Sequence, residues 1–200
     1  MLSRMRLNQD CVLVGKKLTL VPYCKHHVLK YHNWMSDQEL QELTASEPLT
    51  LEEEYEMQRS WIDDEEKLTF IALSGTSAAV SKEEEISRMV GDINLFFISS
   101  PEVAEINIMV AENNYKNLGY GTEMLQLMMC YAKQYLNISK FSAKISNSNI
   151  GSIKFFQKQG FHKISSCPIF HEEHYELPVD SPHLALMENN LVKLSYTFSE

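Results

Sequence analysis

Two glycines between an apolar strand and a long amphipathic helix place the strongest constraint on how this chain folds. Gly119 and Gly121 stand in the segment Lys116-Asn117-Leu118-Gly119-Tyr120-Gly121-Thr122. The first amides of a helix have no partner within it, and the aligned peptide dipoles add partial positive charge there. Glycine has no Cβ atom, so a diphosphate can approach this backbone closely, and Lys116 adds positive charge beside it. The segment therefore predicts a diphosphate-binding turn.

The sequence on both sides of the turn predicts a strand, a loop and a helix. Ile106, Ile108 and Val110 alternate with more polar neighbours and share one face of the strand. The opposite face carries the groups that can take part in chemistry, Glu105, Asn107 and Met109. Apolar residues at helical spacing then predict a helix over 119–136. A dinucleotide-binding turn needs a third glycine where this chain has Met124, so that alternative is not supported.

Composition and charge limit the classes of protein to which the chain can belong. Its 200 residues are 44% hydrophobic, enough for one buried core, so a single domain is expected. The formal charge of −9 argues against nucleic-acid binding, because phosphate contacts need clusters of Lys and Arg. This charge favours a basic or amine-bearing partner, or it only aids solubility. No apolar run reaches the ~18 to 20 residues that cross a membrane, so no membrane partner and a cytoplasmic location are expected.

Neither the cysteines nor the histidines predict a metal site. The four cysteines lack the paired close spacing of a zinc site or a disulfide framework. His171 and His174 fall in an expected strand, where they would point to opposite faces. We therefore expect no bound metal and reduced thiols.

Hydrophobic periodicity predicts an α/β (α+β) fold in which a mixed sheet carries helices on its faces. A capping box at Thr50-Leu51-Glu52-Glu53 opens a helix that runs to about Asp64. Residues 74–85 are predicted as an exposed loop, and beyond Val179 both an appended helix and a loose tail remain open. Strands are expected at 17–22, 68–73, 88–97, 105–110, 140–145, 161–167 and 169–177, with further helices at 26–35, 119–136 and 149–159.

Two motifs are similar to those of a known enzyme family. Residues 116–121 resemble the acyl-CoA loop Arg/Gln-x-x-Gly-x-Gly/Ala of the GNAT superfamily of N-acetyltransferases, with Lys116 in place of Arg or Gln. The segment from Asn149 to Phe161 resembles the family's later Asn-x-x-Ala/Ser…Tyr-x-x-x-Gly-Phe block. Residues 17–35 resemble the branch that acetylates ribosomal-protein N-termini. Residues 44–50, 89–96 and 156–158 are closer still to the eukaryotic N-acetyltransferase 9 subfamily.

The resemblance implies a particular fold and a cosubstrate. The sheet would be GNAT-like, mostly antiparallel, with about seven strands, and splayed between the fourth and fifth strands. One acetyltransferase domain would cover residues 1–180, followed by an extension or tail over 181–200. Acetyl-CoA would be the cosubstrate, with its pantetheine arm in the splay. The residues implied to bind it are Met109, Val110, Lys116, Asn117, Leu118, Gly119, Tyr120, Gly121, Thr122, Asn149 and Phe156.

Acetyl transfer to an amine needs a held thioester, an uncharged amine and a stabilised oxyanion. No cysteine or serine has a recognisable base partner in the sequence, so direct attack is predicted. A backbone N–H near Met109 and Val110 can serve as the oxyanion donor. Glu105 is the predicted general base, with Asn107 binding the acceptor or a relay water, although an ordinary ion pair also explains Glu105. Phe156 stands where many relatives carry a Tyr that protonates the departing thiolate, and phenylalanine cannot donate a proton.

These features favour an acetyl-CoA-dependent N-acetyltransferase acting on protein N-termini. An α-amino group, with a pKa of about 7.7 to 8.0, is easier to deprotonate than a lysine side chain near 10.4. The resemblance to N-acetyltransferase 9 implies tubulin N-termini as acceptors. One alternative is a catalytically weak acyl-CoA-binding or protein-interaction module on the same fold, and another is a small-amine acetyltransferase. The oligomeric state is left open.

Overall fold

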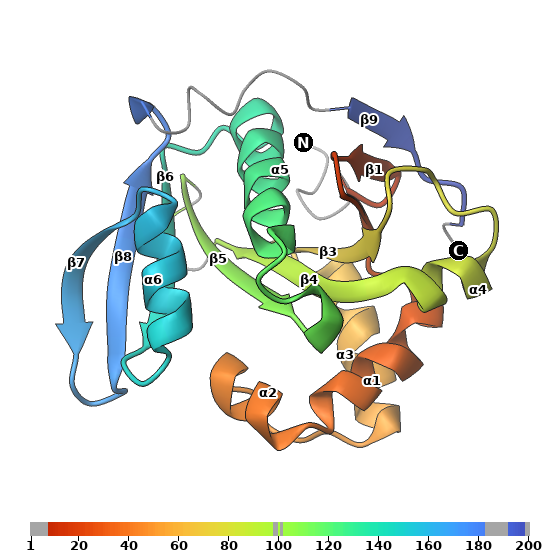
Figure 1. Ribbon diagram of the computed structural model, residues 1–200, viewed down its shortest axis with the longest axis horizontal. Coiled ribbons are helices and arrows are strands. Elements are labelled where there is room, and N and C mark those ends of the chain that lie inside the picture. The colour runs from red at the N-terminus through yellow and green to blue at the C-terminus, as the bar shows by residue number, and fades with distance from the viewer. Residues whose placement is uncertain (1–7, 98–99, 101, 183–191, 199–200) are drawn as a thin grey trace.

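A single mixed sheet organises the chain. The computed structural model describes residues 8–97, 100, 102–182 and 192–198. Within these ranges the strands follow the order β7-β8-β6-β5-β4-β3-β2-β1-β9 (Figure 1). They are β1 Cys11–Val14, β2 Leu18–Pro22, β3 Lys67–Ser74, β4 Met89–Phe96, β5 Val103–Val110, β6 Lys140–Ser146, β7 His162–Cys167, β8 Glu172–Pro178 and β9 Val192–Ser195. The predicted, mostly antiparallel sheet is confirmed, although it has nine described strands and is thus larger than expected.

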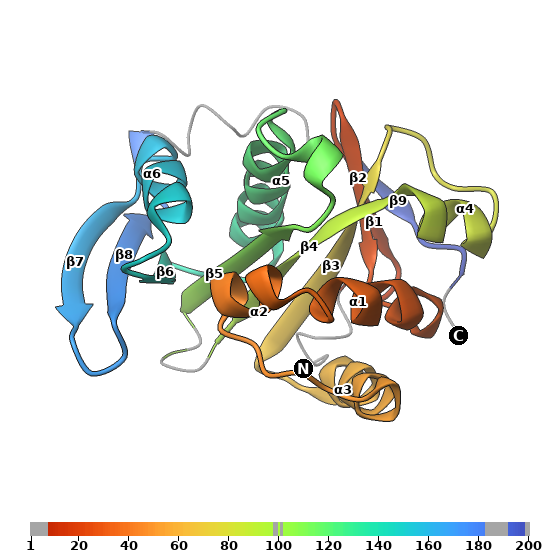
Figure 2. The ribbon, with the colours of Figure 1, turned by 60° about the horizontal axis from the view of Figure 1, so that its bottom comes forward.

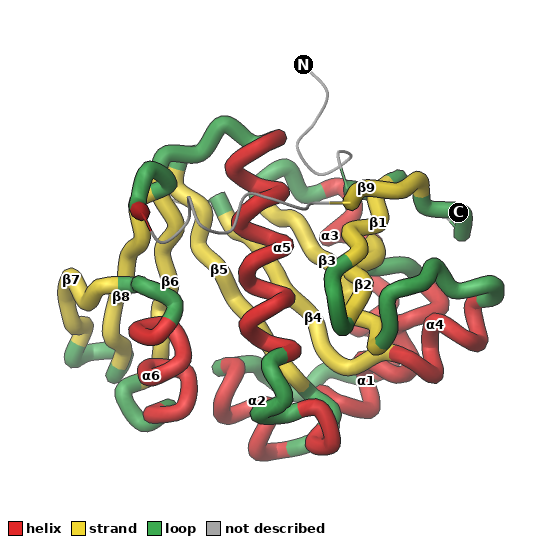
Figure 3. The backbone as a smooth tube through the Cα atoms, turned by 45° about the horizontal axis from the view of Figure 1, so that its top comes forward, coloured by secondary structure: helices red, strands yellow, loops and turns green. Residues whose placement is uncertain are grey.

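Helices cover both faces of this sheet. Figure 2 shows α5 and α6 on one face and α1, α2 and α3 on the other. Helix α5 lies across the middle strands (Figure 3) and packs against β2, β4 and β5. The helices are α1 Val28–Met35, α2 Gln38–Thr44, α3 Leu51–Asp63, α4 Lys82–Arg88, α5 Tyr120–Tyr135 and α6 Ile150–Lys158, and the 3₁₀ turns are η2 Lys25–His27 and η3 Asn113–Tyr115.

The alternation of β5 separates an apolar face from a more polar one, as predicted. Ile106 is buried in the core beneath α5, and Ile108 and Val110 pack against that core. Met109 points the other way, into a second core that includes residues of α1 and α2. Burial of these apolar side chains stabilises the layered arrangement, because it removes apolar surface from water on both faces.

Among the described strands only β5 and β6 run parallel to each other, and their pairing is short. The register joins Val103–Glu105 of β5 to Lys140–Ser142 of β6. Beyond Glu105 the two strands diverge (Figure 1), whereas β4 continues to pair with β5 as far as Val110. The backbone of residues 106–110 therefore has no partner on the β6 side among the described strands. This divergence is the splay that the resemblance implies, since β5 and β6 are the fourth and fifth of the predicted strands.

Strand β1 and helix α2 were not predicted, and two further segments differ from the sequence-based prediction. Residues 74–85, predicted as an exposed loop, contain the start of α4, where Ser81 Oγ accepts a hydrogen bond from Glu84 N at 3.2 Å. The Ser, Gly and Ala residues before Ser81 are typical of a loop, so the sequence analysis did not recognise Ser81 as a helix cap. Residues 192–195 form neither a helix nor a loose tail. They form β9, which pairs antiparallel with β1 and so adds a strand to the far edge of the sheet.

The structure does not test two further predictions, the domain boundary and the location in the cell. The division into a domain over 1–180 and an extension over 181–200 concerns in part residues 183–191, which lie outside the described ranges. No helix in the described part of the chain combines the length and apolar character that a bilayer crossing requires. The expected cytoplasmic location is not decided by that observation.

Gly91 provides a test of how closely β4 and β5 pack. A Cβ atom at Gly91 would collide with the carbonyl oxygen of Met109 on β5. We expect Gly91→Ala to lower the free energy of unfolding by about 1–3 kcal/mol, because the β5 backbone must shift. Urea unfolding measures this change. Gly151→Ala on α6 is the control, since its Cβ would lie 3.7 Å from Asn149 Oδ1 and alanine favours helix. Equal stabilities of Gly91→Ala and the wild type would contradict the expectation.

Candidate functional site

A groove of about 750 Å³ runs along the divergence of β5 and β6 and beneath α1, α2 and α3. Its floor comes from β3, β4 and β5, and its opposite wall comes from β6, α6 and β8. Both predicted catalytic residues, Glu105 and Asn107, line it. So do Met109, Asn149 and Phe156 from the predicted acetyl-CoA set. The structure thus brings together residues from distant parts of the chain that the sequence reading had selected separately.

Polar side chains from three neighbouring strands lie side by side on the groove floor. Alternate residues of a strand share a face, and the register places Asn94 of β4 between Thr69 of β3 and Asn107 of β5. We call this set the polar band; it comprises Lys67, Thr69, Asp92, Asn94, Glu105 and Asn107. Its members on β3 and β4 are buried. Polar groups are costly to bury unless they are hydrogen-bonded, so their contacts need to be accounted for one by one.

Asp92 is the most deeply buried carboxylate of the polar band, with 2% of its surface exposed. Its Oδ2 accepts a hydrogen bond from Asn94 Nδ2 at 2.6 Å, and Asn94 Oδ1 accepts one from Thr69 Oγ1 at 2.6 Å. The other oxygen, Oδ1, is buried without a hydrogen-bond partner among the described residues. Burial raises the pKa of Asp92 to about 6, although the Asn94 hydrogen bond and the charge of Lys67 oppose the change.

Lys67 is the buried base of the polar band. Its Nζ lies over the rings of Trp61 and Phe96. Burial lowers the pKa of Lys67 to about 6, while the charges of Asp92 and Asp64 act in the opposite direction. The groove floor therefore holds an acid and a base that both change charge close to neutral pH. Such groups are typical of functional sites.

Glu105 has a different environment. Its Oε2 lies 2.8 Å from Lys144 Nζ of β6, and the side chains are 17% and 41% exposed respectively. This is a partly solvated ion pair of the kind that also explains a carboxylate on a strand face. Asn107 lies opposite Asn94 and is exposed to the groove. The predicted roles of Glu105 as base and Asn107 as acceptor ligand stay predictions.

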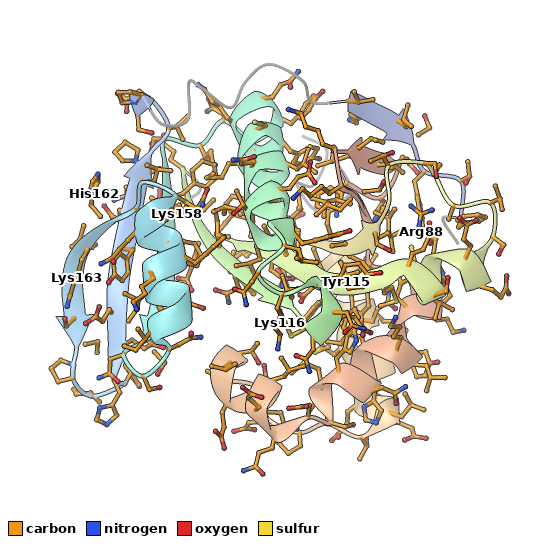
Figure 4. The ribbon with its side chains drawn as sticks, in the orientation of Figure 1. Arg88, Tyr115, Lys116, Lys158, His162 and Lys163 are labelled. Atoms are coloured by element: carbon orange, nitrogen blue, oxygen red, sulfur yellow. The ribbon has the colours of Figure 1, made fainter. Side chains whose placement is uncertain are left out.

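The glycine turn before α5 has the backbone that an anion site requires. Gly119 precedes the helix with a φ of 86°, and Asn117 has a φ of 61°, so both occupy the left-handed region. No side chain in the described residues caps the helix. Figure 4 shows Tyr115 and Lys116 at this turn. The first amides of α5 are therefore free of side-chain acceptors at the place where the sequence predicts a diphosphate.

Gly121 has a different reason to be glycine. A Cβ there would lie 3.6 Å from both Phe155 and Val110, which is ordinary van der Waals contact. Packing within the protein therefore accommodates a methyl group at this position. The structure therefore gives no packing reason for a glycine here, and the predicted close approach of a diphosphate stays a prediction.

A second lysine reaches the same turn from the β1–β2 connection. The Glu123 carboxylate accepts hydrogen bonds from the backbone amides of Lys16 and Lys17. Lys17 Nζ then donates to Leu118 O at 2.7 Å. Lys17 thus adds positive charge to the turn that carries Lys116. The sequence reading missed it, because nothing local to residues 15–18 indicates contact with a helix a hundred residues later.

Asn149 and Phe156 lie on α6 at the wall of the groove. Asn149 Oδ1 accepts a hydrogen bond from Ser152 N at 3.0 Å and so caps this helix. Phe156 is buried and packs edge-on against Phe155 and Phe161. The structure gives both residues a structural role, and their predicted contacts with acetyl-CoA remain predictions.

A separate titratable cluster lies outside the groove lining, around η2. Cys24, His26 and His27 hold atoms that could bind a metal within 4.8 Å of one another. Cys24 N donates to His27 Nδ1, so His27 Nε2 carries the proton that it donates to Glu85. Burial lowers the pKa of His27 to about 4, which keeps it neutral. Burial opposes ionisation of Glu85, yet hydrogen bonds from His26, His27 and Tyr196 lower its pKa to about 2.

Hydrogen bonds within the protein therefore account for the position of these side chains. Glu85 on α4 joins the η2 turn to the segment after β9 through hydrogen bonds of 2.7 Å from His26 and 2.8 Å from Tyr196. The cluster stabilises the junction of three chain segments, and the expectation of no bound metal stays a prediction.

The sequence reading missed Lys67, Asp92 and Asn94. A signal for two of them was present, because Asp92 and Asn94 alternate with the apolar Ile93 and Leu95 in the predicted strand over 88–97. Lys67 directly precedes another predicted strand and gives no such signal. Lys67, Asp92 and Asn94 lie at the candidate site because the register between strands places them beside Asn107.

Comparisons with known proteins identify the family of the chain. A model of the acetyltransferase (GNAT) domain matches residues 17–162. The chain is 47% identical over 181 residues to alpha/beta-tubulin-N-acetyltransferase 9 of Mus musculus, covering 89% of this chain and 75% of that protein. It is 46% identical over 189 residues to the Homo sapiens protein of the same name, covering 92% and 91% respectively.

Solved structures share the fold at lower identity. Spermidine N-acetyltransferase from Vibrio cholerae, in complex with CoA and spermine, matches with a TM-score of 0.69 and 15% identity over 82% of this chain and 96% of that one. The ribosomal alpha-N-protein acetyltransferase RimL, in complex with coenzyme A, matches with a TM-score of 0.69 and 17% identity over 86% and 99%.

The splayed sheet, the glycine turn and these matches define an N-acetyltransferase, and the chain belongs to the GNAT acetyltransferase family. Within that family, the relatives that it resembles over most of its length are N-acetyltransferase 9 proteins.

The two roles considered for Asn149 can be separated by mutation. We expect Asn149→Ala to lower the free energy of unfolding by about 1 kcal/mol, because the cap on Ser152 N is lost. Asn149→Ser keeps a capping oxygen and should keep the stability in urea unfolding. If Asn149→Ser also binds acetyl-CoA as the wild type does, Asn149 serves only as a cap. A loss of affinity at unchanged stability identifies a ligand contact.

Proposed function

We propose that the protein transfers an acetyl group from acetyl-CoA to the N-terminal α-amino group of a protein by direct attack. The main observation in support of this proposal is that the groove and the glycine turn adjoin each other along β5. A groove floored by polar side chains runs along the unpaired edge of β5, and β5 leads directly into the glycine turn at the start of α5. A thioester and its diphosphate can occupy these two features together.

Acetyl-CoA binding would use backbone groups more than side chains. The first amides of α5, with Lys17 and Lys116 beside them, would bind the diphosphate. The backbone of residues 106–110 would pair with the amides of the pantetheine arm, which takes the place of a neighbouring strand. An N–H group near Met109 and Val110 would donate to the oxyanion. Solved proteins of this fold contain CoA, which supports the assignment.

A polypeptide acceptor is supported by the rims of the groove. Leu43 of α2 and Phe170, in the turn between β7 and β8, line the groove and stay 43% and 71% exposed. Exposed apolar side chains around a groove are typical of surfaces that bind other proteins. Glu42 and Glu172 also line it and would attract an ammonium group. The names of the relatives from mouse and human suggest tubulin N-termini as the acceptors.

The leaving group needs little help from the protein. Phe156 supplies no proton at the position where many relatives carry Tyr. A thiol with a pKa of about 8.5 is a fair leaving group near neutral pH, so water can protonate the thiolate. The missing hydroxyl also favours a second candidate, a catalytically weak acyl-CoA-binding module, which would bind acetyl-CoA without turning it over.

Gly121 tests the acetyl-CoA assignment. We expect Gly121→Glu to weaken acetyl-CoA binding by about 100-fold or more in calorimetric titration, because its carboxylate would repel the diphosphate. Gly121→Ala is the matched control for folding, since the added methyl group makes only ordinary contacts. Undiminished binding by a folded Gly121→Glu variant would contradict a diphosphate at this turn.

The acceptor class is tested with paired peptides. We expect acetylation of a peptide that carries a free α-amino group and no acetylation of the same peptide with a blocked N-terminus and an internal lysine. The lysine amine, with a pKa near 10.4, is almost fully protonated at neutral pH. Mass spectrometry locates the added acetyl group, and α- and β-tubulin N-terminal peptides are compared with scrambled ones. Tight acetyl-CoA binding without transfer to any free α-amine would favour the weak module.

A further inference from the structure

Asp92 carries a buried oxygen that has no hydrogen-bond partner among the described residues. Asp92 lines the groove, its Oδ1 is the unpartnered atom, and its Oδ2 accepts a hydrogen bond from Asn94. A buried acceptor without a donor is costly, and native proteins rarely keep one unless a ligand or water completes it. An ammonium group is a donor of the right charge to complete a carboxylate.

The position of Asp92 along the sheet also suits the reaction. Asp92 lies opposite Met109, within the stretch of β5 that has already separated from β6. This is the stretch proposed to hold the thioester. Glu105 belongs to the last residue pair between β5 and β6, at the closed end of the divergence. Asp92 therefore lies beside β5 at the level of the open part of the splay, and Glu105 marks the point where the splay begins.

We propose that Asp92, rather than Glu105, accepts the proton of the acceptor ammonium group, and that Asn94 holds the Asp92 carboxylate in position. This inference rests on the proposed function and names a further residue at the same site. Glu105 is the weaker choice, because its carboxylate is already engaged in an ion pair with Lys144 Nζ at 2.8 Å. Asp92 is held instead by the neutral amide of Asn94, whose own oxygen is fixed by Thr69.

The proton and bond changes balance without another reactant. The ammonium group gives one proton to Asp92 Oδ1, directly or through a water, and the amine lone pair attacks the thioester carbon. A carbon–nitrogen bond forms, and collapse of the tetrahedral species breaks the carbon–sulfur bond. The nitrogen loses its second proton and the departing thiolate gains one through solvent. Asp92 then releases its proton to solvent, so each turnover yields the amide, the free thiol and one proton.

The groups that face Asp92 from neighbouring elements are consistent with this role. Lys67 on β3, Tyr31 on α1, Tyr23 before η2 and Glu54 on α3 interact with it electrostatically or share its surroundings. Burial raises the pKa of both tyrosines, so they stay neutral, and it raises the pKa of Glu54 as well. Burial lowers the pKa of Lys67 to about 6, so its positive charge is largely absent above neutral pH and does not repel an ammonium group.

Asp92 itself has a pKa of about 6, raised by burial, and this sets the sign of the pH dependence. Below that pH the carboxyl group is protonated and cannot accept a proton. The wild-type value of kcat/KM should therefore rise as the pH increases through about 6 and then level off.

The test compares Asp92→Asn with Glu105→Gln, both close in shape to the native residue. Transfer to a peptide with a free α-amino group is measured from pH 5.5 to about pH 9, together with acetyl-CoA affinity and melting temperature. At pH 7 we expect Asp92→Asn to lower kcat/KM about 100-fold with acetyl-CoA affinity unchanged. The loss should shrink to about 10- to 20-fold at pH 9, because the neutral fraction of an α-amine with a pKa of about 7.7 to 8.0 rises about six- to tenfold between pH 7 and pH 9. Any loss of kcat/KM in Glu105→Gln should be smaller than that in Asp92→Asn and should not shrink as the pH rises.

Other outcomes overturn the proposal. A loss for Asp92→Asn that is the same at every pH indicates a structural role, and a pH-dependent loss confined to Glu105→Gln assigns the base to Glu105. Should Asp92→Asn fail to fold, the wild-type profile still tests the proposal, since kcat/KM that does not rise between pH 5.5 and pH 7 contradicts Asp92 as base. If the wild type transfers no acetyl group at all, the proposed function fails as well, so the two failures are distinguishable.

Discussion

The short parallel pairing of β5 with β6 is the constraint on which the rest of the structure depends. Three residue pairs join these strands, and the divergence beyond Glu105 opens the sheet in its middle. A parallel pair needs a crossover, and α5 supplies it, so the helix that begins at the glycine turn is also the connection that makes the splay possible. The candidate diphosphate site and the unpaired strand edge are consequences of one topological feature.

The same sheet supports two very different faces. Beneath α5 it is apolar and stabilises the fold in the ordinary way. Beneath α1, α2 and α3 it carries the polar band. Its burial is tolerated because Thr69 donates a hydrogen bond to Asn94, which donates one to Asp92. That chain of hydrogen bonds ends at Asp92 Oδ1, which has no partner among the described residues. A feature that lowers the stability of the fold, such as a buried acceptor without a donor, is typical of functional sites. Here the residue that carries it lies on the groove floor.

Local patterns were sufficient to predict the centre of the fold. The alternation around Ile106, the glycines of the turn and the Thr50 capping box each depend on residues close in sequence, and the structure confirms the elements that they predict. Short elements such as β1, α2 and β9 span too few residues to show a period. Helix α4 did carry a capping signal, but its loop-like surroundings outweighed that signal.

The site was predicted less completely, for a physical reason. Glu105 and Asn107 could be selected because β5 shows its alternation openly in the sequence. The environment of Asp92 arises from register across three strands and from helices that cover them, and neither is visible in one segment. Lys17 reaches the glycine turn only through the contact of a hairpin with Glu123. Contacts between residues far apart in the sequence determine these positions, and no local sequence pattern indicates such contacts.

The hydrogen bond from Tyr196 to Glu85 and the pairing of β9 with β1 have a practical consequence for how the protein can be shortened. A protein ending at residue 180 would lose both. Strand β1 would then present a row of unpaired backbone groups at the edge of the sheet, which is a template for pairing with another chain. Such a truncated protein would tend to aggregate although every residue of its groove is intact, and its inactivity would reveal nothing about the chemistry.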